Sequence, residues 1–287
     1  MRKITLLFIA ILVLPAACAA DCGLLNLASC LPQKLFEFII SILNAPLQPL
    51  LSLIKSLLTE PVDLSLFSSL WAIIIYVLSL FYGILLLYSG FNFILSGYDA
   101  VKRANAKEWF RNIFVMIVLV QASYFLYSIV VELNSILASA MINMIDDSFF
   151  KLTADNIVNL GLQFFFLIFY VLILLISVIL LVIRYIIVAA GVVLIPIAIF
   201  LYFIPPLQDY GKLIMNFLGI CIFLTFFDSI ILLVCSRLIY VPLFANFKIL
   251  VMIAAFTIAN LLMVFLMLFA AMQSTLSFNK KGSGIAS

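Results

Sequence analysis

The sequence predicts an all-α polytopic membrane protein with five or six transmembrane helices, preceded by an N-terminal amphipathic or re-entrant helical hairpin. Of its 287 residues, 68% are hydrophobic and only 9% are charged. A soluble chain is closer to half apolar and a quarter charged, so this one has too little polar surface to cover itself. Long apolar stretches also recur between residues 66 and 272, several of them long enough to cross a bilayer.

The composition argues against an enzyme. The chain has no histidine, which removes the commonest general base, the imidazole triads and the usual zinc chemistry. It has no GxxxxGK[ST] phosphate loop, so energy from ATP would have to come from a partner. The net charge is only +3 and the basic residues are scattered, so no tract would hold nucleic acid by phosphate neutralisation alone. We expect no cofactor and no metal.

The first twenty residues have the form of a signal peptide. Arg2 and Lys3 precede an apolar core at Ile4–Leu14, and small residues at 17–20 form a cleavage zone. The apolar core is too short to span a bilayer, although an uncleaved anchor is the alternative. Lipid modification at Cys18 is disfavoured, because a proline stands where such motifs carry an aliphatic residue.

Residues 21–64 are expected to form an exported interfacial segment. In an oxidising exterior Cys22 and Cys30 could form a small-loop disulfide. The stretch 33–59 is apolar, but prolines interrupt it and polar residues are spaced through it. We expect two amphipathic helices in the outer interface, or a shallow re-entrant hairpin.

Residues 65–275 form the predicted transmembrane domain, which begins with spans at Leu66–Ser89 and Phe110–Val131. The loop between them, 99–111, is expected on the cytoplasmic side, because basic residues accumulate in cytoplasmic loops. Its basic residues are Lys102, Arg103, Lys107 and Arg111. The next loop, 141–158, carries three aspartates and suits the exterior, in agreement with an exported N-terminus.

Three glycines, Gly83, Gly90 and Gly97, recur every seven residues and would therefore lie on nearly the same helix face. Small residues on a membrane helix let a second backbone approach closely. We expect a helix-packing role, with chance spacing as the alternative.

Gly161–Ile204 is an apolar stretch in which Arg184 is the only charge. One helix of this length would be about twice as long as the hydrocarbon core is thick. We therefore expect the chain to turn, with Arg184 reaching the cytoplasmic face at the turn. The second half, 191–204, would be either a full span or a re-entrant helix.

The last predicted spans are Met215–Val234 and Ile249–Met272, followed by a short polar tail at 276–287. With six spans the C-terminus lies outside; with five it lies inside. The distribution of basic residues leans weakly towards five.

Asp228 lies well inside a predicted span, where a carboxylate is costly and is expected to face protein or water. It could line a conduit, pair with Arg184 or Lys212 to fix the helix arrangement, or be a hydrogen-bonded structural residue. A proton-coupled carrier normally has several such groups along a path. Asp228 is nearly alone, which argues against a transporter.

The segment Val188–Pro206, VAAGVVLIPIAIFLYFIPP, is followed by the polar turn Gln208–Lys212 and another long apolar span. This pattern resembles the TrbL family of conjugal-transfer membrane proteins, and it is closest in character to their distant archaeal relatives of the CedA type. Members of the TrbL family carry a small-residue and proline-containing helix, an aromatic-proline turn with a charged group, and then a long helix.

The resemblance implies a homo-oligomeric channel or scaffold subunit of a type IV secretion-type apparatus in the cytoplasmic membrane, with DNA as cargo. It implies partners in a cytoplasmic ATPase, a pilus and membrane lipid. Lys102, Arg103, Lys107 and Arg111 become the candidate ATPase contact, and Pro205, Pro206 and Asp209 a candidate turn near the conduit. Two alternatives remain, namely a small-solute transporter or permease subunit, and a scaffold that assembles surface filaments without passing DNA.

Overall fold

The computed structural model describes residues 45, 47–150, 160–244 and 247–282. The predicted signal peptide, Cys22, Cys30 and residues 33–44 of the predicted interfacial helices lie outside the described residues. The loop 141–158 is described only as far as residue 150.

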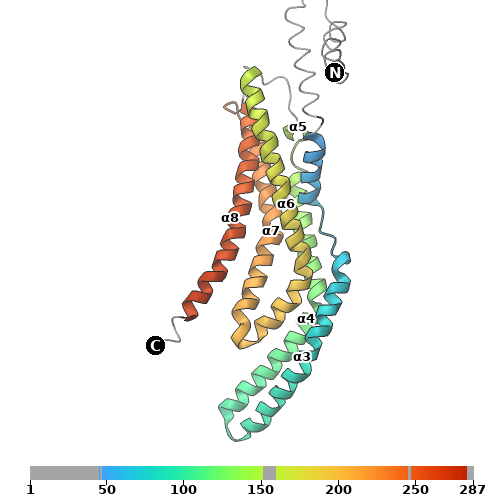
Figure 1. The fold of residues 1–287 in the computed structure, drawn as a ribbon, viewed down its shortest axis with the longest axis vertical. Coiled ribbons are helices and arrows are strands. Elements are labelled where there is room, and N and C mark those ends of the chain that lie inside the picture. The colour runs from blue at the N-terminus through green and yellow to red at the C-terminus, as the bar shows by residue number, and fades with distance from the viewer. Residues whose placement is uncertain (1–44, 46, 151–159, 245–246, 283–287) are drawn as a thin grey trace, which may run out of the picture.

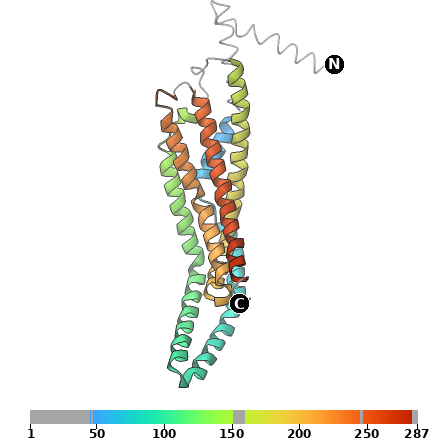
Figure 2. The same ribbon diagram turned by 90° about the vertical axis from the view of Figure 1, so that its left-hand side faces the viewer.

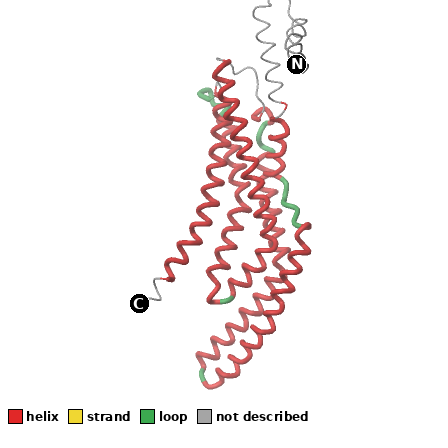
Figure 3. Tube along the Cα trace, viewed as in Figure 1, coloured by secondary structure: helices red, strands yellow, loops and turns green. Residues whose placement is uncertain are grey.

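The described residues are almost entirely helical and contain no strand (Figure 3). Five of the helices, α3, α4, α6, α7 and α8, are long and apolar enough to cross a membrane. The fold is therefore that of a multi-pass helical membrane protein. In chain order the elements are a helix at Leu47–Thr59, here called the cap helix, then η2 (Ser65–Phe67), α3 (Ser68–Leu95), η3 (Ser96–Tyr98), α4 (Ala100–Ile142), α5 (Asp147–Phe150), α6 (Leu160–Phe203), η5 (Pro205–Leu207), α7 (Gln208–Leu238) and α8 (Lys248–Gly282).

The five long helices form an elongated antiparallel bundle (Figures 1 and 2). Helix α6 is central, because it packs against α3, α4, α7 and α8, whereas α7 packs against α4, α6 and α8, and α3 packs against α4 and α6. One end of the bundle, here the arm end, contains the α3–α4 turn, the α6–α7 turn and the C-terminal end of α8. The cap helix, α5 and the α7–α8 connection lie at the opposite end, here the cap end.

Helix α4 is much longer than its predicted span of 110–131, because the expected loop at 99–111 is helical. Asp99 is the N-cap: its carboxylate accepts hydrogen bonds from the backbone N–H of Val101 at 2.9 Å and of Lys102 at 3.4 Å. The connection to α3 is thereby reduced to the short η3 turn. Together the ends of α3 and α4 form an arm that extends past the α6–α7 turn (Figure 1).

The predicted turn at Arg184 is wrong, because α6 is one continuous helix of 44 residues, about 66 Å long at 1.5 Å per residue. Pro196 lies inside it without ending it; membrane helices tolerate proline where neighbouring helices satisfy the freed backbone groups. Residues 191–204 are thus neither a separate span nor a re-entrant helix. The described chain has five spans, and the end of α8 lies at the same end of the bundle as the 99–111 segment.

The cap helix packs into the cap end of the bundle, because Leu47, Ile54 and Leu58 are buried together with residues of α4–α8. Its last carbonyl, that of Thr59, also accepts a hydrogen bond from the Ser135 hydroxyl of α4. On the outer faces of the bundle large apolar side chains are exposed along all five long helices, as the 68% exposure of Tyr76 on α3 illustrates. Lipid is the solvent that such a surface requires.

Candidate functional site

A line of buried polar side chains runs through the contact between α4, α6 and α7, within the spans. We call it the polar seam, and it consists of Tyr127, Asn134, Arg184, Thr225 and Asp228. All five are almost completely inaccessible; Arg184 is 3% exposed and Asp228 is 2% exposed. Polar groups in a membrane interior are costly unless other protein groups satisfy them, so their partners decide what the seam can do.

Arg184 is fixed by the backbone of α7. Its Nε donates to the carbonyl of Cys221 and its Nη2 donates to the carbonyl of Ile222, both at 2.9 Å. Two parallel bonds from one planar guanidinium fix both the distance and the rotation of α6 against α7. The expectation that Arg184 reaches the membrane surface is therefore wrong: the side chain finds its acceptors inside the protein.

Asp228 lies further along α7, and neither of its carboxylate oxygens has a hydrogen-bond partner among the described residues. The charge of Arg184 acts on Asp228 through space, but the structure shows no direct ion pair between these two side chains. The alternative pairing with Lys212 is wrong, because Lys212 lies about 24 Å away along the α7 axis. Since Asp228 is enclosed, it lines no open conduit within the single chain.

Tyr127 and Asn134 tie α4 to its neighbours. The Tyr127 hydroxyl donates to the Val188 carbonyl of α6 at 2.6 Å, and the Asn134 amide donates to the Thr225 hydroxyl of α7 at 2.8 Å. The sequence reasoning did not select either residue. An asparagine inside an apolar stretch was the available signal, since interhelical hydrogen bonds of this kind hold membrane helices together.

The glycines that allow close helix approach are not those with the seven-residue spacing. A Cβ added to Gly83, Gly90 or Gly97 would meet no described atom within 4 Å, so these residues pack no helix of the described chain. A Cβ at Gly191 would instead overlap the Tyr127 hydroxyl and Leu218, and one at Gly211 would overlap the backbone of Ala198 and Tyr202. Gly191 therefore leaves the space that Tyr127 occupies in the polar seam, and Gly211 allows α7 to approach the backbone of α6 closely at their turn.

The predicted turn near the conduit lies at the arm end. Pro205 and Pro206 open the η5 turn, and Asp209 lies in the first turn of α7. Lys212 lies over the Tyr202 ring, with its Nζ 5.9 Å from the ring centroid. The turn is thus held by Gly211 and by this cation–π contact, and it is separate from the polar seam.

The basic residues of the arm are exposed, namely Lys102, Arg103, Lys107 and Arg111. Arg103 lies over the Phe93 ring at 5.9 Å, and Arg111 forms a long ion pair of 3.8 Å with Glu108. A cleft of about 780 Å³ separates the arm from the Pro205–Pro206 turn, and Lys102, Trp109 and Tyr88 line it.

Among the described residues no cluster of three His, Cys, Asp or Glu side chains could hold a metal ion. Cys221 and Cys235 are buried free thiols. Comparison of the chain with protein-family models, with curated proteins and with solved structures gives no match. The function must therefore be argued from the geometry of the bundle.

Proposed function

We propose that this protein is a non-enzymatic channel or scaffold subunit of a conjugation-like, type IV secretion-type DNA-transfer apparatus in the cytoplasmic membrane. The observation that carries the proposal is the arm. It extends beyond the α6–α7 turn (Figure 1), and its basic side chains are exposed, as expected of a contact for a partner outside the lipid. The TrbL-like pattern at Val188–Lys212, which spans the α6–α7 turn beside the arm, supports this choice.

The proposed orientation follows from the basic residues. Lys102, Arg103, Lys107, Arg111 and Lys212 all lie near the arm end, so the positive-inside rule puts that end in the cytoplasm. The cap helix then lies outside, as an exported N-terminus requires. Gly97 and Met144 lie at opposite ends of the bundle and are exposed. Cysteine at 97 should be protected from an impermeant maleimide in intact cells, and cysteine at 144 should be labelled; the reverse pattern refutes this orientation.

The proposed oligomer follows from the enclosed seam. The single bundle is closed along the contact of α4, α6 and α7, so any path for DNA would have to form between subunits. The outer flank of α3 offers apolar side chains and the unpacked glycines Gly83 and Gly90, which suit a helix of a second copy. Crosslinking between cysteines at 83 in membranes tests this contact, with cysteine at Ile168 on the lipid-facing side of α6 as the control.

The primary test is genetic. Deletion of the gene should abolish exchange of chromosomal markers between two distinguishable strains, and the intact chain should restore it. A complementing chain with Lys102, Arg103 and Lys107 changed to glutamine should reach the membrane at normal levels but restore little exchange. Lysine-directed crosslinkers at Lys102 and Lys107 should trap a cytoplasmic ATPase. Normal exchange in the deletion strain refutes the proposal.

A second function, a solute or ion transporter, is favoured by Asp228, whose buried carboxylate has no hydrogen-bond partner among the described residues. Such groups mark ion and proton paths in transporters. The two functions differ in what they require at this position. A transfer subunit needs only a side chain of the same shape, so Asp228→Asn should preserve marker exchange. Loss of ion-coupled uptake in the same variant, with exchange unaffected by gene deletion, would favour the transporter.

A further inference from the structure

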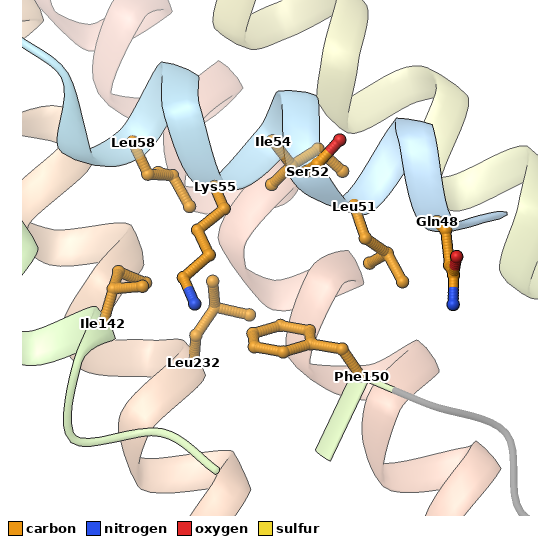
Figure 4. Close-up of a pocket in the computed structure, with 9 residues that line it drawn as sticks. All are labelled: Gln48, Leu51, Ser52, Ile54, Lys55, Leu58, Ile142, Phe150 and Leu232. Carbon is orange, nitrogen blue, oxygen red and sulfur yellow. The ribbon is translucent and has the colours of Figure 1, made fainter. Parts of the chain in front are cut away.

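A cavity of about 220 Å³ lies between the cap helix and the cap end of the bundle (Figure 4). Its walls are mainly carbon. They are formed by Leu51, Ile54 and Leu58 of the cap helix and by Ile142, Phe150 and Leu232 of α4, α5 and α7. A dry apolar cavity of about 150 Å³ is enough to bind benzene, so this one can hold a longer piece of hydrocarbon.

The cavity also contains one cationic side chain. Lys55 belongs to its lining, and Figure 4 shows the side chain extending from the cap helix towards the walls contributed by α4, α5 and α7. Gln48 adds a polar side chain to the lining, whereas the Ser52 hydroxyl donates to the Pro49 carbonyl at 2.9 Å. The site therefore combines a hydrocarbon-compatible interior with an ammonium group, which is the pattern that an anionic amphiphile requires.

We propose that this cavity is a binding site for an anionic membrane lipid, with one acyl or isoprenoid chain between the cap helix and α7 and the phosphate at Lys55. Lysine is a common phosphate binder, and the carbon walls beside Lys55 suit the hydrocarbon chain of the same molecule. A free phosphate fits less well, because it would leave the carbon walls of the cavity without an apolar partner.

The position of the cavity explains why a lipid can reach it. The described run of the cap helix, Leu47–Thr59, is too short to span a bilayer, and it packs against helices that are long enough to do so. Its Leu53, on another face, is 43% exposed. A lipid entering beside the cap helix would join that helix to α7 and so contribute to holding it in place.

The test uses the full-length protein in vesicles that contain phosphatidylglycerol or phosphatidylcholine with a photoreactive diazirine in one acyl chain. We expect the phosphatidylglycerol probe to label peptides containing Leu51, Phe150 or Leu232 at least fivefold more than the phosphatidylcholine probe. Lys55→Gln should reduce labelling by the anionic probe to the level of the neutral one. Leu51→Trp, which fills the cavity, should reduce labelling by both.

Two matched variants control for charge and bulk. Lys107→Gln removes a lysine at the arm end, and Leu53→Trp adds the same bulk to an outward position of the cap helix; both should label like the wild type.

Native mass spectrometry of the unmodified protein adds a measurement independent of any variant, and should show phosphatidylglycerol retained after exchange into neutral detergent. Equal labelling by the two probes, labelling unchanged in Lys55→Gln, no retained lipid, or crosslinks from the cavity to residues 1–44 would each overturn the proposal.

Discussion

Replacing Arg184 with methionine should destabilise the helix bundle without changing its topology. The substitution keeps an unbranched side-chain stem but removes the guanidinium and both of its hydrogen bonds to the carbonyls of Cys221 and Ile222. Interhelical hydrogen bonds in membrane proteins contribute about 0.6 kcal/mol on average and about 1.7 kcal/mol at most. Two of them therefore account for about 1 to 3 kcal/mol.

Asp228 adds a second contribution, because Arg184→Met leaves this buried carboxylate without the cation that acts on it. Removing one member of a buried charged group generally costs more than the hydrogen bonds alone. We expect Arg184→Met to lower the free energy of unfolding by about 2 to 4 kcal/mol. Asp228→Asn should change it by less than about 1 kcal/mol, since neither carboxylate oxygen has a hydrogen bond to lose among the described residues.

The double variant is the informative measurement. If Arg184 stabilises an ionised Asp228, then Arg184→Met should lower the free energy of unfolding by less when position 228 is already asparagine. Unfolding in mixed micelles, titrated with a denaturing detergent, gives the four free energies of the cycle. Arg111→Met is the control, because this arginine is exposed and its ion pair with Glu108 spans 3.8 Å. A cost below about 1 kcal/mol for Arg184→Met would refute the view that Arg184 fixes α6 against α7.

Three further predictions follow from the described contacts. Gly191→Leu should prevent correct packing of α4 against α6 and reduce the yield of folded protein, whereas Gly83→Leu should be tolerated in the single chain; size-exclusion profiles compare the two. Tyr127→Phe should cost about 1 kcal/mol in unfolding experiments, because one buried hydrogen bond is lost. The Ser65 hydroxyl and backbone N–H lower the pKa of Asp63. The Asp63 carboxylate therefore stabilises the fold above its unfolded pKa and loses this effect as the pH falls through the lower folded value. Ser65→Ala should reduce the acid dependence of the melting temperature below about pH 4.

The helical class of the protein could be read from the sequence, but the choice between five and six spans and the ends of several helices could not. Hydropathy located α3, α4, α7 and α8, since each contains a long apolar run. It placed the start of α4 ten residues too late, at Phe110 instead of Ala100, because the basic residues before it were assigned to a loop. Basic side chains are compatible with a helix when they lie on an exposed face, and Asp99 supplies the cap that starts it.

Whether a glycine is needed for helix packing depends on residues that are distant in the chain, and the spacing of the glycines does not contain this information. Gly83, Gly90 and Gly97 were selected by their regular spacing, which is a property of one helix. Whether a glycine is needed depends on what lies opposite, and only the fold brings Tyr127 against Gly191. The small residues Ala189, Ala190 and Gly191 in succession were a usable signal, although nothing in that run identifies the side chain that fills the space.

The wrong prediction for α6 has one physical cause. If bilayer thickness limits the length of a helix, then α6 has to turn and Arg184 has to reach water. That limit applies to a helix surrounded by lipid. Helix α6 packs against α3, α4, α7 and α8 along its course, so its ends can extend beyond the hydrocarbon, and the backbone of α7 replaces water as the acceptor for Arg184. A lone arginine in a long apolar stretch thus indicates either a turn at the membrane surface or a helix whose partner offers carbonyls. Only the position of α7 distinguishes the two.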